Sequence, residues 1–485
     1  MRFRFIFSIV AFMSIFLGLA QLAPVAIDLY FHNTHSALLF LSSCVFTCSI
    51  STLLYWALRP KEEQPLRTKE MFLTTTLIWI SYALWGALPI YLSVSHLSVA
   101  DAFFESMSGL TTTGATILSG LDYLPRGLLM WRAIMQWLGG IGVILIAVTI
   151  LPTLRIGGMQ FFTTEFSGDA MRQSPTVLQT MRLISAVFIS LTIACMLLLK
   201  NAGMNWFDAL AHAMTTISTG GFSTHDASIA FYDNPYIEWV LIAFMFFAGL
   251  PLVVWIQFFK RQFYLIRQNA QIKTYIRFVL VALALLLLGR RLFGTLITQT
   301  SIRSSLFSLL SVMTTTGFVS ENYGLWGNFS ILFFLFLLSV GACAGSTSGG
   351  IKMFRFAILG REMSARLKSS IQPHAVIVPR YGNKAISQDI SSAVLFFLGI
   401  YLLAVCLGSL ALSLTGLDVM TSFSGALTAL ANVGPGLGNF IGPDSTFAEL
   451  PDVAKIILSF LMLLGRLEFI TVLVLFLPFL WRRST

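Results

Sequence analysis

Long runs of apolar residues recur along the whole chain and are separated by shorter polar stretches. A helix needs about 20 consecutive apolar residues to cross the ~30 Å hydrocarbon core of a bilayer. The apolar residues here form continuous runs and do not alternate with polar ones, which excludes a membrane β-barrel. The pattern predicts ten spanning helices, over residues 5–28, 37–58, 71–95, 128–152, 181–200, 236–258, 276–298, 329–359, 390–414 and 453–480.

Four further segments are apolar but too short to cross, with roughly 10–15 residues each. They cover residues 101–110, 208–217, 302–313 and 418–431. Each follows an outward helix, precedes an inward one and leads into a polar motif: "LTTTGATILSG" (110–120), "ISTGGFSTHD" (217–226), "MTTTGFVSEN" (313–322) and, more loosely, "ANVGPGLGNF" (431–440). The unit of helix, short helix, polar motif and helix therefore occurs four times, which indicates an internal repeat.

The short segments begin with residues that cap helices well. Asp101, Asp208 and Asp418 can accept hydrogen bonds from the free N–H groups of a helix start, and Asn205 is an alternative cap for the second. In the third segment the predicted cap is a serine, Ser301, Ser304 or Ser305. Each short helix then ends at its polar motif, so the partial negative charge of its C-terminus favours a cation there.

The polar motifs themselves suit a cation. Non-helical backbone at membrane depth is tolerated only where it is buried in protein or lines a water-filled path. Glycine permits positive φ, and threonine hydroxyls add oxygen ligands. A ring of four such loops can replace the hydration shell of a monovalent cation. The alternative is four helix-capping loops without a shared axis, which the repetition at matched positions disfavours.

Composition agrees with a polytopic all-α membrane protein, because 56% of the 485 residues are hydrophobic and only 11% are charged. We expect two extra N-terminal helices in residues 1–70, followed by four repeats in residues 71–155, 156–260, 261–362 and 363–485. The first apolar run is too long for a typical signal peptide and no convincing cleavage site follows it, so we interpret it as a transmembrane helix.

Charge predicts the orientation. Most of the 31 lysines and arginines lie on the side of the two termini, which places both termini in the cytoplasm. The net charge of +10 then reflects topology and contact with anionic lipid, and nucleic-acid binding is not expected. Many acidic residues lie on the opposite side, where they would concentrate cations at an outer mouth; ordinary topological asymmetry is the alternative.

Motifs of enzymes and metal sites are missing from the sequence. The five cysteines all lie in apolar runs, and the six histidines have no metal-binding spacing. No catalytic triad or paired-acid motif is found, so we expect no enzymatic activity.

Two interruptions stand out among the predicted helices. In the first, "GACAGSTSGGIK" (341–352) divides the long span 329–359 with four glycines and several hydroxyl residues, and such a loop must lie inside the protein. It is not a phosphate loop, because the lysine is Lys352 where that motif requires position 351. In the second, Arg466 lies within the apolar stretch "MLLGRLEFITVL". Arg466 is interpreted as a barrier or latch in a permeation path, with a buried pair to an acid such as Glu468 as the alternative.

The chain resembles the Trk/Ktr/HKT potassium-transporter superfamily and, within it, the TrkH-type membrane subunits of bacteria. The resemblance covers essentially the whole chain. It is carried by "TTTGAT" (111–116), "STGGFST" (218–224), "TTTGF" (314–318), "NVGPG" (432–436), "QWLGGIG" (136–142), "GSTSGGIK" (345–352) and "GRLE" (465–468). The fourth motif departs from the pattern, because Asn432 and Val433 replace threonines and put its side-chain contribution in doubt.

The resemblance implies potassium uptake through one central pore, made by four repeats of helix, pore helix, filter and helix. The implied K⁺ filter comprises Thr111, Thr112, Thr113, Gly114, Ser218, Thr219, Gly220, Thr315, Thr316, Gly317, Asn432, Val433 and Gly434. The implied gating residues are Gly345, Ser346, Thr347, Ser348, Gly349, Gly350, Lys352 and Arg466.

The resemblance also implies partners and a location. It predicts a homodimer in the bacterial cytoplasmic membrane, with one pore per protomer and membrane lipid around it. A cytosolic, TrkA-like nucleotide-binding ring would dock on the basic inner surface, including a small hairpin predicted at 374–387. The nucleotide would bind that partner and not this chain. The alternative function is a secondary transporter for a small solute, with a binding site at the membrane midplane.

Overall fold

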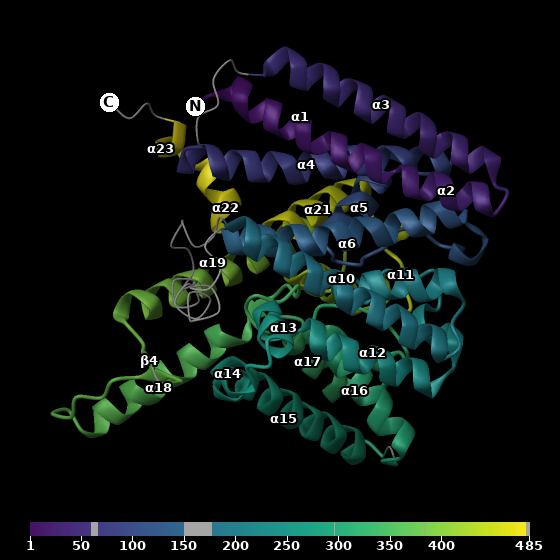
Figure 1. The fold of residues 1–485 in the computed structure, drawn as a ribbon. Helices are drawn as coiled ribbons and strands as arrows, with labels where there is room; N and C mark the ends of the chain where they lie inside the picture. The colour runs from purple at the N-terminus through teal and green to yellow at the C-terminus, as the bar shows by residue number, and fades with distance from the viewer. Residues whose placement is uncertain (60–65, 150–176, 295, 383, 482–485) are drawn as a thin grey trace.

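The computed structural model describes residues 1–59, 66–149, 177–294, 296–382 and 384–481, and almost all of its regular structure is helical. The expected boundary between the first two repeats, at residues 155 and 156, lies outside the described residues. Two N-terminal spans come first. The first consists of α1 (Phe3–Ala20) and α2 (Leu22–Tyr30), and the second is α3 (Thr34–Leu58). They pack against one another and against α4 on one side of the molecule (Figure 1).

Four units follow. Each has a long first helix, which we call the outer helix, then a short helix, and then the helical elements after the polar motif, which we call the inner segment. The first contains α4 (Thr68–Ser93), α5 (Val99–Leu110), η1 (Leu121–Tyr123) and α6 (Arg126–Thr149). The second contains α10 (Val177–Asn201), α11 (Trp206–Ile217), η2 (Ser228–Tyr232), α12 (Pro235–Ala248) and α13 (Leu252–Phe259), and α14 (Phe263–Gln268) follows it.

The third unit contains α15 (Ala270–Leu292), α16 (Gln299–Met313), η3 (Tyr323–Leu325), α17 (Asn328–Leu337), β1 (Val340–Gly341), β2 (Ile351–Lys352) and α18 (Met353–Ile371). A hairpin of β3 (Arg380–Tyr381) and β4 (Lys384–Ala385) leads to the fourth unit. That unit contains α19 (Gln388–Ser413), α20 (Val419–Ala431), η4 (Phe447–Glu449), α21 (Asp452–Arg466), α22 (Ile470–Leu473), η5 (Val474–Phe476) and α23 (Pro478–Trp481).

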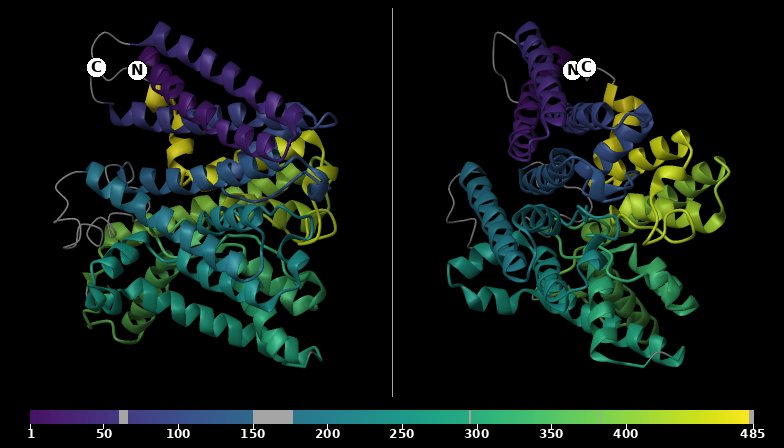
Figure 2. Two further views of the ribbon diagram at one scale, coloured as in Figure 1. Left: turned by 45° about the vertical axis from the view of Figure 1, so that its right-hand side comes forward. Right: turned by 90° about the vertical axis from the view of Figure 1, so that its right-hand side faces the viewer.

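The four short helices, α5, α11, α16 and α20, have 12, 12, 15 and 13 residues. At about 1.5 Å per residue they reach roughly 18–23 Å, which is less than the bilayer core. Each packs against helices of its own unit, and three also contact an inner helix of another unit: α5 contacts α21, α11 contacts α6 and α16 contacts α12. The units therefore follow one another around a common centre (Figure 2).

The starts of the short helices differ in detail from the prediction. The capping residues are Ser98, Asn205, Thr298 and Asp418, so only the fourth predicted cap and the alternative Asn205 are correct. Asp101 lies one turn inside α5, where its carboxylate accepts from the Ser98 N–H in a capping box at 3.0 Å. Asp208 occupies the equivalent position in α11. The third helix begins before the predicted serines, because the Thr298 hydroxyl accepts from the Ser301 N–H.

The predicted spans are largely present, with two corrections. Among the described residues, seven helices are long and apolar enough to cross a membrane, and α12 with α13 makes an eighth candidate bent by 98°. The span predicted at 236–258 is therefore not a single straight helix. The span predicted at 453–480 is wrong as a continuous helix, because α21 ends at Arg466 and Glu468 and Phe469 have positive φ.

The two ends of the described chain meet. The ring of Phe3 in α1 stacks on that of Trp481 in α23, with centroids 6.4 Å apart. The predicted hairpin is present as the antiparallel pair of β3 and β4, although Asn383 at its turn lies outside the described residues. In Figure 1, α18 and this hairpin project at the lower left and the N-terminus lies at the upper left, so they are on the same side of the molecule in that view.

Candidate functional site

The four polar motifs meet at one point, each packed against the next. Every motif contains one positive-φ glycine on which an added Cβ atom would collide with a carbonyl oxygen of a neighbouring motif. The distances from such a Cβ to that oxygen are 2.1 Å from Gly114 to Gly220, 1.8 Å from Gly221 to Thr316, 2.1 Å from Gly317 to Val433 and 2.7 Å from Gly434 to Thr113. These four contacts close into a ring, which we call the glycine ring.

The glycine ring corrects one assignment from the sequence. The sequence places Gly220 in the implied filter, but the residue whose positive φ of 78° is equivalent to that of Gly114 is Gly221. The backbone bonds agree, because the Gly220 N–H reaches a carbonyl five residues back, as the Thr113 N–H does. Two adjacent glycines make the sequence ambiguous, and only backbone geometry separates them. Gly220 contributes its carbonyl oxygen to the ring instead.

A second backbone feature repeats in all four motifs. Two residues before each ring glycine, a non-glycine residue has positive φ: Thr112 (52°), Thr219 (54°), Thr315 (58°) and Asn432 (56°). The left-handed conformation costs such a residue about 1–2 kcal/mol. Strain repeated at four matched positions indicates that the loop shape itself is required.

The threonine hydroxyls mostly hold their own loops together. Thr111 Oγ1 donates to the Met107 carbonyl at 2.7 Å and lies 2.8 Å from Thr113 Oγ1. In the third motif Thr314 bonds a helix carbonyl and lies 2.8 Å from Thr316 Oγ1 in the same way. In the second, Ser218 and Thr219 bond nearby backbone carbonyls. The hydroxyls of these residues therefore stiffen the loops.

The divergent fourth motif joins its neighbour through a side chain. Asn432 Nδ2 donates to Thr113 Oγ1 at 3.0 Å and to the Met462 carbonyl at 2.9 Å. The residue that departs from the threonine pattern therefore connects the first and fourth motifs. Val433 is buried, and its N–H bonds the Thr428 carbonyl as in the other loops.

On one face of the glycine ring lies a cavity of about 270 Å³. Gly114, Gly221 and Gly317 are partly exposed to it, whereas the threonines behind them are fully buried. Its wall is completed by the segments that follow the motifs, including His225 and Asp226. We call this cavity the vestibule.

On the opposite face, the loop between β1 and β2 lies directly against the motifs. The Gly349 N–H donates to Thr315 Oγ1 at 2.7 Å, and Thr347 Oγ1 donates to the Ile217 carbonyl at the end of α11 at 3.1 Å. A Cβ on Gly349 would lie 2.2 Å from the Ala431 oxygen. The loop thus contacts three of the four units.

Internal bonds and a neighbouring helix break hold this loop in shape. The hydroxyls of Ser346 and Ser348 lie 2.9 Å apart, and Lys352 Nζ donates to the Ser348 carbonyl. The Gly345 carbonyl accepts from Leu252 N–H at 3.0 Å, where α13 begins. Gly345 and Gly350, at the two ends, have positive φ of 78° and 65°.

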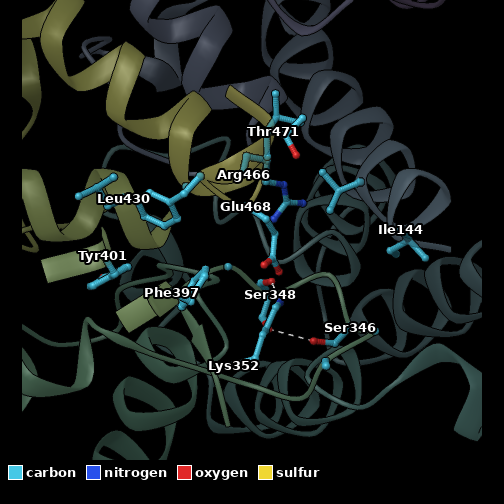
Figure 3. Close-up of a pocket in the computed structure, with 18 residues that line it drawn as sticks. Ile144, Ser346, Ser348, Lys352, Phe397, Tyr401, Leu430, Arg466, Glu468 and Thr471 are labelled. Atoms are coloured by element: carbon cyan, nitrogen blue, oxygen red, sulfur yellow. Dashed lines mark hydrogen bonds between the residues drawn. The ribbon is translucent and has the colours of Figure 1, made fainter. Parts of the chain in front are cut away.

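Arg466, the last residue of α21, is bound to the loop. Its Nη1 donates to the Thr347 carbonyl at 2.8 Å, while Nε and Nη2 have no hydrogen-bond partner among the described residues. The side chain is 5% exposed and borders a cavity of about 60 Å³ together with Lys352 and Glu468 (Figure 3). Glu468 pairs with Arg355 at 2.6 Å, so the alternative in which it pairs with Arg466 is wrong.

Comparisons with known proteins cover nearly the whole chain. The family model TrkH, described as a cation transport protein, matches residues 38–483. The chain belongs to the TrkH family. It is 38% identical to the Trk system potassium uptake protein TrkI of Halomonas elongata, covering 99% of this chain and 98% of that one. It is 36% identical to TrkH of Escherichia coli, covering 99% and 100%.

A solved structure supports the fold. The crystal structure of the potassium transporter TrkH from Vibrio parahaemolyticus matches with a TM-score of 0.90 and 32% identity, covering 99% of this chain and 100% of that chain. The protein is therefore a polytopic helical membrane protein with the TrkH fold.

Three residues at this TrkH-family site are not among the site residues inferred from the sequence. Gln136 in α6 donates to the Gly220 carbonyl at 2.6 Å and accepts from the Phe222 N–H at 3.0 Å, so it brackets Gly221. Glu105 and Arg132 form a buried ion pair behind the first two motifs. A polar or charged residue inside a predicted helix is a signal for such a role, but its partner is set by tertiary structure.

Proposed function

We propose that this chain forms the membrane pathway for potassium uptake in a bacterial Trk system. The observation that carries the proposal is the glycine ring, in which four loops pack against one another in a closed cycle. Four equivalent sets of backbone oxygens around one axis provide the coordination that replaces the hydration shell of a monovalent cation. The relatives that cover nearly the whole chain are named as potassium uptake proteins, which supports K⁺ as the transported ion.

The electrostatics of the site favour a cation over an anion. All four short helices end at the motifs, so their C-terminal partial charges add there. The filter in this proposal comprises four residues of each loop, which end at the ring glycine of that loop. They are residues 111–114, 218–221, 314–317 and 431–434. It therefore includes Gly221, Thr314 and Ala431 besides the residues inferred from the sequence.

Gating is proposed to lie on the other face of the ring. The loop 345–350 occupies the path directly beneath the motifs, and Arg466 adds a positive charge beside it. Because Thr347 bonds both α11 and Arg466, movement of the loop would break contacts with two units at once. Lys352, anchored to Ser348, is placed to couple the loop to α18.

The proposal includes a setting and partners. The protein lies in the bacterial cytoplasmic membrane with both termini inside, in contact with lipid, as a homodimer with one pore per protomer. α18 and the β3–β4 hairpin are the proposed docking surface for a TrkA-like ring that carries the regulatory nucleotide. The chain acts as a transporter, with K⁺ as its cargo, and not as an enzyme.

Uptake of radioactive Rb⁺ by liposomes that contain the purified protein tests this function. We expect uptake above that of empty liposomes, with inhibition by external K⁺ at lower concentrations than by Na⁺. Uptake of a neutral or organic solute with no Rb⁺ flux would contradict the proposal and favour a secondary transporter with a midplane site.

A further inference from the structure

A buried ion pair lies directly behind the first two filter loops. Arg132 of α6 donates from Nε to Glu105 Oε1 of α5 at 2.8 Å, and their side chains are 1% and 0% exposed. Removing two charges from water is costly, and replacing a buried ion pair by apolar residues of similar size often leaves a protein equally stable. Stability alone therefore gives no reason for the pair, and its other contacts indicate what it does.

Glu105 holds the segment that follows Gly114. Its Oε2 accepts from the Ile117 N–H at 2.9 Å, and its two oxygens accept from Thr116 Oγ1 at 2.9 and 3.1 Å. Thr116 is only two residues beyond the ring glycine. The carboxylate thus fixes the backbone immediately above the first filter loop.

Arg132 reaches the second filter loop at the same time. Its Nη1 donates to the Ser223 carbonyl at 2.9 Å, and its Nη2 donates to Thr116 Oγ1 at 3.0 Å. Its guanidinium carbon lies 4.1 Å from the centre of the Phe222 ring. Each guanidinium nitrogen therefore has a partner: Nε bonds Glu105 of α5, and Nη1 and Nη2 bond two different loops.

The other two loops are supported differently. In the third, Ser311 Oγ donates to the Phe318 carbonyl at 2.7 Å. In the fourth, Ser424 Oγ donates to the Leu437 carbonyl and accepts from its N–H, at 2.8 and 3.0 Å. These neutral bonds stay within one unit. Among the buried ion pairs described, the Glu105–Arg132 pair is the one bonded to two filter loops.

We propose that Glu105 and Arg132 are positioning residues that set ion selectivity by fixing the distance between the first and second filter loops. A guanidinium whose three nitrogens are all hydrogen-bonded has little freedom, so it keeps the two loops in register against thermal motion. Without it, the ring would widen or narrow at one joint and accommodate Na⁺ more readily. This inference rests on the proposed function and adds to it which residues control discrimination.

Four variants test the proposal. Glu105→Gln and Arg132→Lys keep the size of the side chains but remove part of the bonding. Thr116→Val removes only the hydroxyl that both partners share, and Thr116→Ser restores it. Proteoliposomes are supplied with Rb⁺ and Na⁺ tracers, and the ratio of the two fluxes is measured per folded protein.

The matched control is a second ion pair of similar geometry. Arg303 of α16 donates to Glu238 of α12 at 2.7 Å, and none of the bonds described for the two side chains reaches a filter loop. We expect the Rb⁺/Na⁺ flux ratio to fall about tenfold in Glu105→Gln and Arg132→Lys and about threefold in Thr116→Val. We expect Thr116→Ser, Arg303→Lys and Glu238→Gln to keep the wild-type ratio.

A second readout separates positioning from simple structural support. The melting temperature of the purified protein is measured in KCl and in NaCl, because an ion held in the filter stabilises the folded state. We expect wild type to melt higher in KCl and the Glu105 and Arg132 variants to lose that difference. An equal loss of stability in both salts, with an unchanged flux ratio, would overturn the proposal. Absence of Rb⁺ flux in wild type would instead contradict the proposed function.

Discussion

The glycine ring and the inner segments beneath it are built on opposite principles. On the ring itself the four loops are nearly alike, with the same two positive-φ positions in every unit. Beneath it the four inner segments differ. α6 is continuous, α12 and α13 bend by 98°, α17 gives way to the loop 345–350, and α21 stops at Arg466. Coordination needs equal contributions from all units, whereas closing a path needs a change in only one or two.

The glycines of the inner segments show where the two principles meet. A Cβ on Gly139 would lie 1.8 Å from the Leu110 oxygen, and one on Gly465 would lie 2.0 Å from the Leu430 oxygen. In the first and fourth units the inner helix thus touches the end of its short helix without a side chain between them. In the third unit the loop takes over this place beneath the ring.

The largest expected effect comes from substituting a glycine of the glycine ring. Gly221→Ser would place a Cβ 1.8 Å from the Thr316 oxygen at a φ of 78°, so backbone must move at a joint of the ring. We expect the K⁺/Na⁺ flux ratio to fall by about tenfold or more. The equivalent Gly114→Ser and Gly317→Ser should behave alike. Flux ratios in proteoliposomes measure the effect.

Two control variants sharpen this prediction. Gly416 has a φ of 90° with no atom within 4 Å of an added Cβ, so Gly416→Ser introduces the backbone strain without the collision. Gly220→Ser meets the side chain of Gln136 instead of a carbonyl. We expect wild-type selectivity for Gly416→Ser and an intermediate loss for Gly220→Ser. A Gly220 variant more damaging than Gly221→Ser would contradict the corrected register.

The region beneath the ring is tested by shortening the loop 345–350. Deleting residues 346–349 removes the bonds to Ile217 and Thr315 and opens the path below the ring. We expect Rb⁺ flux per folded protein to rise about tenfold or more while the K⁺/Na⁺ ratio stays near that of wild type. A folded deletion variant with flux at or below wild type would show that the loop is not the gate.

Substituting Arg466, which also lies beneath the ring, should change Rb⁺ flux less than the loop deletion does. A unit charge about 6 Å from a passing ion costs on the order of 3 kcal/mol at an effective dielectric of 20, and cavity water reduces this. We expect Arg466→Ala to raise Rb⁺ flux about fivefold and Arg466→Lys, which keeps the charge, to change it much less. Because no carboxylate pairs with Arg466 among the described residues, Arg466→Ala leaves no acid unpaired there. Unaltered flux in stable Arg466→Ala would place the side chain outside the pathway.

The same contrast explains what could be predicted from the sequence. The ends of the short helices at Leu110, Ile217, Met313 and Ala431 agree with the prediction, because glycine-rich polar motifs cannot continue a buried helix. The caps were less accurate, since several polar residues near each start can accept the same bond. Long-range pairs could not be predicted: Arg355 and Glu468 are 113 positions apart, and nothing in the sequence distinguishes Glu468 as the partner of Arg355 and not of Arg466.

The smallest predicted effect concerns the vestibule, where His225 joins the first two units. Its ring stacks on Phe231 with centroids 3.6 Å apart, its Nδ1 pairs with Asp122, and its Nε2 lies 3.3 Å from Asp208. Burial alone would lower the pKa of His225, but the hydrogen bonds and charges of Asp208 and Asp122 outweigh it and raise that pKa above its usual value.

The folded protein holds the proton of His225 more tightly than the unfolded chain does. Protonated His225 therefore stabilises the folded state, and this contribution is complete below about pH 6.5. It is lost as the pH rises through the higher pKa of the folded state. We expect the melting temperature of wild type to fall by on the order of 1 °C relative to His225→Gln between about pH 6 and pH 9, and Asp122→Asn to reduce that difference. Parallel pH profiles for wild type and His225→Gln would mean that the imidazole is neutral in the folded protein. The contact between the first two units would then depend on the buried Glu105–Arg132 pair and not on the vestibule.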